Sequence, residues 1–263
     1  MFVSAQSTLL DTDAALRLVT QQLAEKLSGA ATFAVVFSTI EHASSFEQIA
    51  AAVAKQLGTA NIIGCTAETV VANEVEHEGE PCLVVWAAQI PSMTVVPVVF
   101  DFQNTPGGPA ISGWPPELAT YADAGSTLLL LGEPFTFPTD LLLETLRENR
   151  PALAVFGGMA SAAQEQGRNR LLQGKTVHKR GAVGLFLHAE PACPVAITGV
   201  VSQGCRPIGP TFIVTKAERN AIEQLAGKPA LVRLQEVFAE LSEQDQALAR
   251  RGLHVGCAMN EYR

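Results

Sequence analysis

Three short segments of the sequence combine glycines with side chains that can bind or react. They are GCTAE (64–68), GGMAS (157–161) and QGCRPIGP (203–210), and each follows an apolar run. Backbone N–H groups in a glycine turn can hold an anion, a thiol beside an arginine can become reactive, and a guanidinium recognises carboxylates through paired hydrogen bonds. The segments therefore predict either a carboxylate-binding site or a reactive thiol. The candidate residues are Gly64, Cys65, Thr66, Glu68, Gly157, Gly158, Ser161, Gly204, Cys205 and Arg206.

Each segment also has a purely structural interpretation. Gly64 and Cys65 are small, as a tight core requires, and free cysteine is among the most buried residue types. Ser161 could bond a ligand or could cap the segment that follows it. Pro207 biases Arg206 toward an extended backbone, and the guanidinium could meet a carboxylate ligand or pair with one of the 26 acidic side chains. The residue types alone leave both interpretations open.

Other kinds of site lack their sequence signatures. The 5 histidines have no metal-ligand spacing such as H-E-x-x-H, and the 5 cysteines form no C-x-x-C pair. GGMAS lacks the third glycine of G-x-G-x-x-G and the lysine of a P-loop, and the chain contains no G-x-S-x-G. We therefore expect neither a metal nor another cofactor.

The composition narrows the range of partners. The 263 residues carry a formal net charge of −8, and the one basic run, KTVHKR (175–180), is short. We interpret that run as a solvated loop rather than a phosphate site, so we do not expect a nucleic-acid partner. No apolar run approaches the roughly 20 residues of a membrane helix, and the first ten residues do not resemble a signal peptide. Because the cysteines are odd in number and widely spaced, we expect a location in the reducing cytoplasm.

Apolar periodicity places the glycine segments at the ends of strands. The first half of the chain predicts two helices and four strands, the last two strands forming a hairpin. The helices are expected at 11–28 and 45–57, and the strands at 33–40, 61–68, 82–88 and 93–100.

The same order of elements returns after a linker at 102–125 that is rich in glycine and proline. Its members are a strand at 126–133, a helix at 138–149, a strand at 152–161 and a strand pair at 181–187 and 194–201. The two glycine turns match at an offset of 157 − 64 = 93 residues. We predict an internal duplication with copies at about 30–101 and 124–203, against the alternative of chance similarity. The expected fold is mixed α/β (α+β), with duplicated strand–helix–strand–turn–strand–strand units packed as layered sheets with helices outside.

The order of motifs along the chain resembles that of a known family. IGCTAE, EGEP with a strand pair, FGGMAS, GAVGLFL, VSQGCRPIGP and NAIEQLAGKPAL follow one another as they do in the FIST domain family. GCRPIGP, together with the Asn-x-Ile-x-x-Leu-x-Gly-x-Pro-Ala run at 220–230, is the most specific part of this resemblance. It implies an N-terminal FIST module over 1–210 and the start of a C-terminal module over 211–263, which is shorter than the family's.

The resemblance also implies a function. FIST domains occur in bacterial signal-transduction proteins and in eukaryotic F-box proteins, and they are regarded as sensory domains for small ligands such as amino acids. A binding module is therefore expected rather than an enzyme. Its implied partners are a small molecule, either an amino acid or another carboxylate, and a signalling protein.

Two other functions stay open from the residues alone. A thiol enzyme would use Cys65 or Cys205, with Arg206 lowering the thiol pKa, and it would need a histidine within hydrogen-bond reach of the sulfur. A protein-interaction scaffold would show an exposed apolar patch without a polar cavity. The sensor, by contrast, requires Gly64, Gly158 and Arg206 to converge on one cavity.

Overall fold

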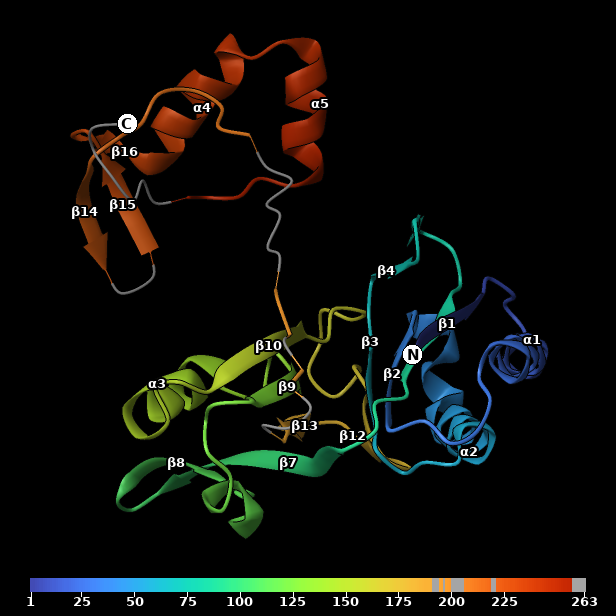
Figure 1. Ribbon diagram of the computed structural model, residues 1–263. Coiled ribbons are helices and arrows are strands. Elements are labelled where there is room, and N and C mark those ends of the chain that lie inside the picture. The colour runs from blue at the N-terminus through green and yellow to red at the C-terminus, as the bar shows by residue number, and fades with distance from the viewer. Residues whose placement is uncertain (191–193, 196, 200–205, 219–220, 257–263) are drawn as a thin grey trace. The chain divides into compact units, whose positions relative to one another are not determined.

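The computed structural model describes residues 1–190, 194–195, 197–199, 206–218 and 221–256 (Figure 1). The chain divides into two units, Met1–Gly199 and Val200–Arg263. The first half of the first unit contains β1 (Phe2–Ser7), α1 (Thr12–Lys26), β2 (Phe33–Ser38), the 3-10 helix η1 (Ile40–Ser45), α2 (Phe46–Leu57), β3 (Ile62–Thr66), β4 (Thr69–Ala72), β5 (Val75–Glu78) and β6 (Leu83–Ala88). Its second half contains β7 (Met93–Thr105), β8 (Gly108–Ser112), the 3-10 helix η2 (Pro116–Ala119), β9 (Ser126–Gly132), α3 (Thr139–Asn149), β10 (Ala154–Met159), β11 (Leu171–Gln173), β12 (Thr176–His178) and β13 (Ala182–Ala189).

The first unit contains two large sheets with the same arrangement at their centres. One sheet has the order β1-β6-β2-β3-β11-β12, and the other has the order β10-β9-β13-β7-β8. In each, a parallel pair joined by a helix (β2 with β3, β9 with β10) lies beside an antiparallel strand (β6 or β13). The order β3-β2-β6-β1 thus matches β10-β9-β13-β7. The register matches too, because the pair Phe33 and Ala88 corresponds to Ser126 and His188, at offsets of 126 − 33 = 93 and 188 − 88 = 100.

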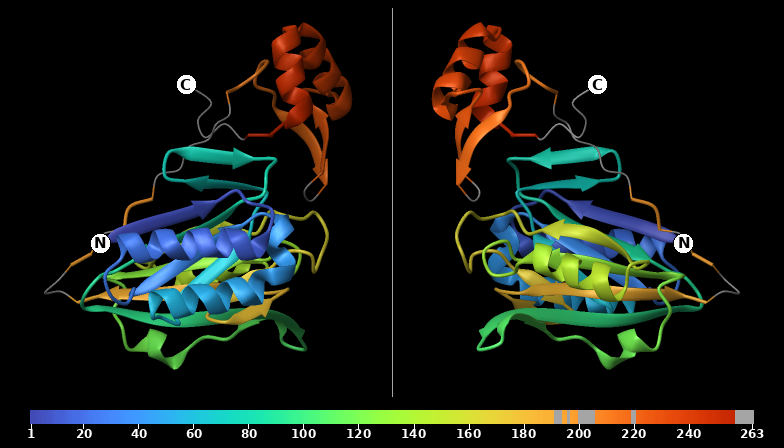
Figure 2. Two further views of the ribbon diagram at one scale, coloured as in Figure 1. Left: turned by 90° about the vertical axis from the view of Figure 1, so that its right-hand side faces the viewer. Right: turned by 90° about the vertical axis from the view of Figure 1, so that its left-hand side faces the viewer.

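The described part of this unit has four apolar cores, and three of them lie between its four layers. Figure 2 shows α1 and α2 on one face of the unit and α3 on the opposite face. The first core lies between α1, α2 and one face of the six-stranded sheet, and it includes Ile49 and Leu57. The second lies between α3 and the outer face of the five-stranded sheet, and the third lies between the two sheets. Burial of a side chain the size of Ile49 contributes about 1.5–3 kcal/mol. The predicted mixed α/β fold with layered sheets and outer helices is therefore confirmed.

Local signals in the sequence explain where the helices begin and end. Asp11 accepts a hydrogen bond of 2.8 Å from the N–H of Ala14 and so caps the start of α1. Gly58, with φ of +62°, ends α2 in the left-handed conformation that glycine adopts without strain.

The two halves differ in where their short hairpins lie. The hairpin β11–β12 crosses to the first sheet, where β11 pairs antiparallel with β3, whereas β4 and β5 form a two-stranded sheet of their own. The connectors explain this difference, because residues 160–170 separate β10 from β11 whereas only residues 67–68 separate β3 from β4. The longer connector gives the second hairpin the reach to join the other sheet, and it leaves β10 at a sheet edge.

The predicted hairpin between 82–88 and 93–100 is wrong. β6 lies between β1 and β2, whereas β7 belongs to the other sheet, where it pairs with β13 and β8. Both strands are apolar and adjacent in the chain, which favours a hairpin in the sequence, but the short turn between them carries the chain from one sheet to the other. Residues 102–125, predicted as a linker, contain the end of β7, all of β8 and η2. The strand predicted at 194–201 lies partly outside the described residues, and its described positions are not in a strand.

The second unit is small. It contains β14 (Val214–Glu218), β15 (Ala221–Leu225), β16 (Lys228–Pro229), α4 (Ala230–Glu240) and α5 (Glu243–Arg251). The three strands form one antiparallel sheet in the order β14-β15-β16. Ser242 caps α5 by accepting a hydrogen bond of 3.2 Å from the N–H of Asp245.

Candidate functional site

The predicted glycine turns are in fact the ends of two strands, because Gly64 lies in β3 and Gly157 and Gly158 lie in β10, and the segments that follow these strands meet directly. The N–H of Ser161 donates to the carbonyl of Thr66 at 3.1 Å. The N–H of Glu68 donates to Ser161 Oγ, also at 3.1 Å, across 93 residues of sequence. Arg170 adds a further link, because its N–H donates to Thr66 Oγ1 at 3.0 Å and its carbonyl accepts from the N–H of Thr66 at 3.0 Å. These polar groups therefore bind the two halves to each other.

Two of the predicted glycines serve close packing between parallel strands. A Cβ at Gly64 would lie 2.3 Å from the carbonyl oxygen of Val36, and one at Gly157 would lie 1.7 Å from that of Leu130. Each of these carbonyls belongs to the residue that pairs with the glycine in the sheet. Gly158 differs, because a Cβ there would meet nothing within 4 Å.

The thiol of Cys65 lies in the core between the two sheets, where it is 3% exposed. Burial raises its pKa to about 12, so the reactive thiolate does not form near neutral pH. Three histidines of the first unit bond other groups: His42 bonds Thr12, His77 bonds Glu80 and Gln6, and His188 bonds Ser126. His178 lies two strands from Cys65 in the sheet and forms no hydrogen bond with its sulfur. In the described part of the chain, Cys65 therefore has no histidine as a base. Gly204 and Cys205 lie outside the described residues.

Arg206 belongs to the second unit, where it forms an ion pair with Asp245. The neighbouring Gly209 has φ of +69°, and a Cβ there would lie 2.6 Å from Val237 Cγ1. Within its unit this segment therefore serves ion pairing and packing. Convergence of Arg206 with Gly64 and Gly158 on one cavity stays a prediction.

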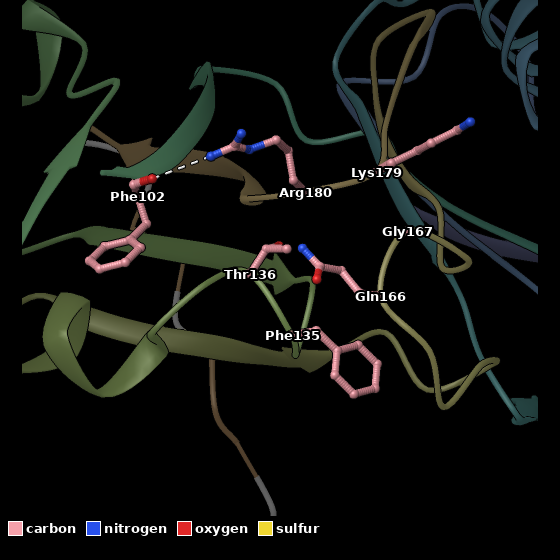
Figure 3. A pocket seen from close by; sticks show the side chains of 7 residues that line it. All are labelled: Phe102, Phe135, Thr136, Gln166, Gly167, Lys179 and Arg180. Carbon is pink, nitrogen blue, oxygen red and sulfur yellow. Dashed lines mark hydrogen bonds between the residues drawn. The ribbon is translucent and has the colours of Figure 1, made fainter. Parts of the chain in front are cut away.

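A pocket of about 420 Å³ lies at one end of the strands of the five-stranded sheet, beside the turn that follows β9 (Figure 3). Its walls come from β7, from the turn after β9, from the 160–170 connector and from the residues before β13. Strand ends of this kind are where ligands commonly bind in α/β proteins. The lining residues are Phe102, Phe135, Thr136, Gln166, Gly167, Lys179 and Arg180.

The charge that lines this pocket is positive. Arg180 is anchored by Asp101, with Nη2 at 3.0 Å and Nε at 3.2 Å from Asp101 Oδ1, and Nη2 also donates to the carbonyl of Phe102 at 3.4 Å. Its Nη1 has no hydrogen-bond partner in the described part of the chain and is available to a ligand. Lys179 is exposed, and Figure 3 shows its side chain directed away from the other lining residues.

A buried polar network fixes the wall of the pocket. Thr136 Oγ1 donates to Glu133 Oε2 at 2.7 Å and accepts from the N–H of Gly181 at 3.1 Å. Glu133 is fully buried and also accepts from the N–H of Phe135 at 3.1 Å and from Asn169 Nδ2 at 3.4 Å. Because buried polar groups must be paired to be tolerated, this network holds the turn after β9 against the 160–170 connector.

None of the predicted site residues that the structure describes lines this pocket. The one signal in the sequence is the run KTVHKR. The prediction of a solvated loop is wrong here, because Thr176–His178 form β12 and the Lys179 and Arg180 that follow line the pocket. The other walls come from segments as far apart as 102 and 167, so only the folded chain brings them together.

The described part of the chain was also searched for metal-binding clusters and for membrane-spanning helices. There, no group of three or more His, Cys, Asp or Glu side chains is arranged to hold a metal ion. No described helix is both long enough and apolar enough to cross a membrane.

Comparison with known proteins places this architecture in a family. A family model of the FIST N domain matches residues 32–228. The chain belongs to the FIST family. FIST domains are sensory domains. This FIST chain is 34% identical over 238 residues to the uncharacterised protein Rv0628c of Mycobacterium tuberculosis, covering 90% of the chain and 59% of that protein.

A second relative matches the chain with similar identity and coverage. The FIST chain is 35% identical over 242 residues to the uncharacterised protein Mb0898c of Mycobacterium bovis, covering 92% of the chain and 60% of that protein. The chain thus spans about three-fifths of the length of the curated relatives that it matches.

Proposed function

We propose that this FIST chain is a cytoplasmic sensory module that binds a small carboxylate, an amino acid or a related compound, and passes the signal to a protein partner. The observation that carries the proposal is the pocket of about 420 Å³, which combines two cations with two aromatic rings and two polar side chains. Pockets of roughly 300–1,000 Å³ with a few convergent polar groups are typical of small-molecule sites. Membership of a sensory family supports the same conclusion.

The lining residues suit distinct parts of such a ligand. Arg180 would hold the carboxylate through Nη1, and a charge-assisted hydrogen bond of this kind contributes about 1.5–3 kcal/mol. Thr136 and Gln166 would orient the ligand, while Phe102 and Phe135 would cover its apolar part. A ligand held this way links the turn after β9 to the 160–170 connector, so binding would favour the conformation in which these segments are together.

The proposal describes a binding module rather than an enzyme. Its support is that the Cys65 thiol is buried between the sheets, with its pKa raised to about 12. A thiolate nucleophile at this position would need both exposure and a nearby base or cation.

The test is a thermal-shift screen of the purified chain against amino acids and small carboxylates. A ligand at 100 times its Kd adds about 2.7 kcal/mol to the free energy of unfolding, which raises Tm by several degrees. Arg180→Ala should abolish the shift. Arg168→Ala is the matched control, because Arg168 is an exposed arginine of the 160–170 connector that pairs with Glu165 at 3.6 Å and does not line the pocket. The proposal is contradicted if no compound raises Tm, or if all three proteins respond equally.

A further inference from the structure

The lining of the pocket bears on which carboxylates it accepts. We infer that the pocket selects carboxylates that have an apolar body and no ammonium group, so that it prefers a simple carboxylic acid to the amino acid of the same shape. This inference rests on the proposed function and deepens it.

The first observation is the charge of the lining. The seven lining residues include two cations, Lys179 and Arg180, and no carboxylate. A carboxylate ligand is attracted by Arg180, and Lys179 adds positive charge nearby although its side chain is directed away from the other lining residues. An α-ammonium group brought into the same space would lose hydration and would meet like charge instead of a partner.

The second observation is that the carboxylates nearest to the pocket are already engaged. Asp101 is held by Arg180, and the fully buried Glu133 accepts hydrogen bonds from Thr136, Phe135 and Asn169. Glu165 precedes the lining residue Gln166, but its side chain is 75% exposed and pairs with Arg168. An ammonium group could therefore gain an anionic partner only by breaking one of these interactions.

The third observation is the aromatic part of the lining. Phe135 is 47% exposed, although a ring of this size is usually buried, and Phe102 of β7 lies on the other side of the pocket (Figure 3). A ligand with an apolar body would cover both rings and remove apolar surface from water. Acetate and other very small anions would leave this surface exposed.

The test compares ligands that differ only in the ammonium group. Isothermal titration calorimetry would measure Kd for 3-phenylpropanoate against phenylalanine, and for 4-methylpentanoate against leucine, with acetate as the small anion. We expect each simple carboxylate to bind at least about tenfold more tightly than its amino acid, and acetate to bind more weakly than either.

A charge variant provides the reverse experiment. Gln166→Glu places a carboxylate in the lining, so it should weaken the binding of 3-phenylpropanoate. The ratio of the Kd of phenylalanine to that of 3-phenylpropanoate should therefore fall, or drop below one. Gln164→Glu is the matched control, because Gln164 is exposed in the same connector and does not line the pocket.

The outcomes separate this inference from the proposed function. If phenylalanine binds as tightly as 3-phenylpropanoate, or more tightly, the inference is overturned and the carboxylate sensor stands. If no compound binds at all, both are overturned. If Gln164→Glu alters the preference as much as Gln166→Glu does, selection does not come from the lining of this pocket.

Discussion

At the scale of single residues, Gly157 and Gly158 are neighbours in β10 but have opposite surroundings. A Cβ at Gly157 would lie 1.7 Å from the carbonyl oxygen of Leu130, and its φ of +155° is one that other residues rarely adopt. A Cβ at Gly158 would meet nothing within 4 Å. Gly157→Ala should therefore lower the free energy of unfolding by about 2 kcal/mol or more, and Gly158→Ala should change it by less than about 0.5 kcal/mol.

Urea denaturation of the two variants and the parent chain measures this difference. Each variant is the control for the other, because the same atoms are added at adjacent positions. Equal losses in both would contradict the close approach of β9 and β10 at Gly157.

The sequence predicts where the two glycine segments lie relative to each other, but it predicts neither that their glycines belong to strands nor where the pocket lies. The repeat of GCTAE and GGMAS indicated that two glycine turns occupy equivalent places, and Thr66 and Ser161 do meet by a hydrogen bond. The sequence could not show that the available polar groups there bond to each other. It also could not show that Arg180 is positioned by Asp101, because that pairing spans 79 residues.

At the scale of elements, the 160–170 connector depends on the buried amide of Asn169. This side chain accepts from the N–H of Ala163 at 3.0 Å and donates to Glu133 at 3.4 Å. Asn169→Ala would remove the partner of the Ala163 N–H and of Glu133 Oε1, so we expect a loss of about 1–3 kcal/mol in the free energy of unfolding. The amide hydrogens of Thr66 and Arg170, which bond the end of β3 to the end of the connector, should also exchange faster with deuterium.

Asn149→Ala is the control for this prediction. Asn149 is exposed at the end of α3, and its Nδ2 donates to the carbonyl of Thr145 at 2.8 Å. Its removal should change stability by less than about 0.5 kcal/mol. Unchanged exchange of the Thr66 amide in Asn169→Ala would show that the connector does not depend on this network.

The sequence predicts the elements better than it predicts their pairing. Strand–helix–strand units show clearly in apolar periodicity and glycine turns, because these signals are local. Pairing is not local: β6 and β7 are apolar neighbours in the chain, yet they lie in different sheets. The strands β11 and β12 have three residues each within a polar segment, which is too short to give a periodic signal.

At the scale of the whole molecule, the buried His42 and the half-buried His178 make stability depend on pH. Burial lowers the pKa of His42, although Glu41 acts in the opposite direction, and burial also lowers the pKa of His178. The unfolded chain therefore takes up protons before the folded chain does. Their contribution to stability is fully present above about pH 6.5 and declines as the pH falls toward the lower pKa values of the folded state.

Replacement of His42 tests this dependence. His42→Gln should flatten the decline of Tm between about pH 6.5 and pH 5, while His254→Gln, at an exposed position, should leave it unchanged. If Tm declines identically in the parent chain and in His42→Gln, other titratable groups cause the loss of stability at acidic pH.

We propose that the ligand binds in the pocket beside the turn after β9, rather than at the strand ends that carry Gly64 and Gly157. The most direct measurement is mapping of backbone amide chemical shifts by NMR during titration with 3-phenylpropanoate. We expect the largest changes at Thr136, Gln166, Gly167 and Arg180. Changes concentrated in the segments 64–68 and 157–161, with those four amide shifts unchanged, would contradict binding in this pocket.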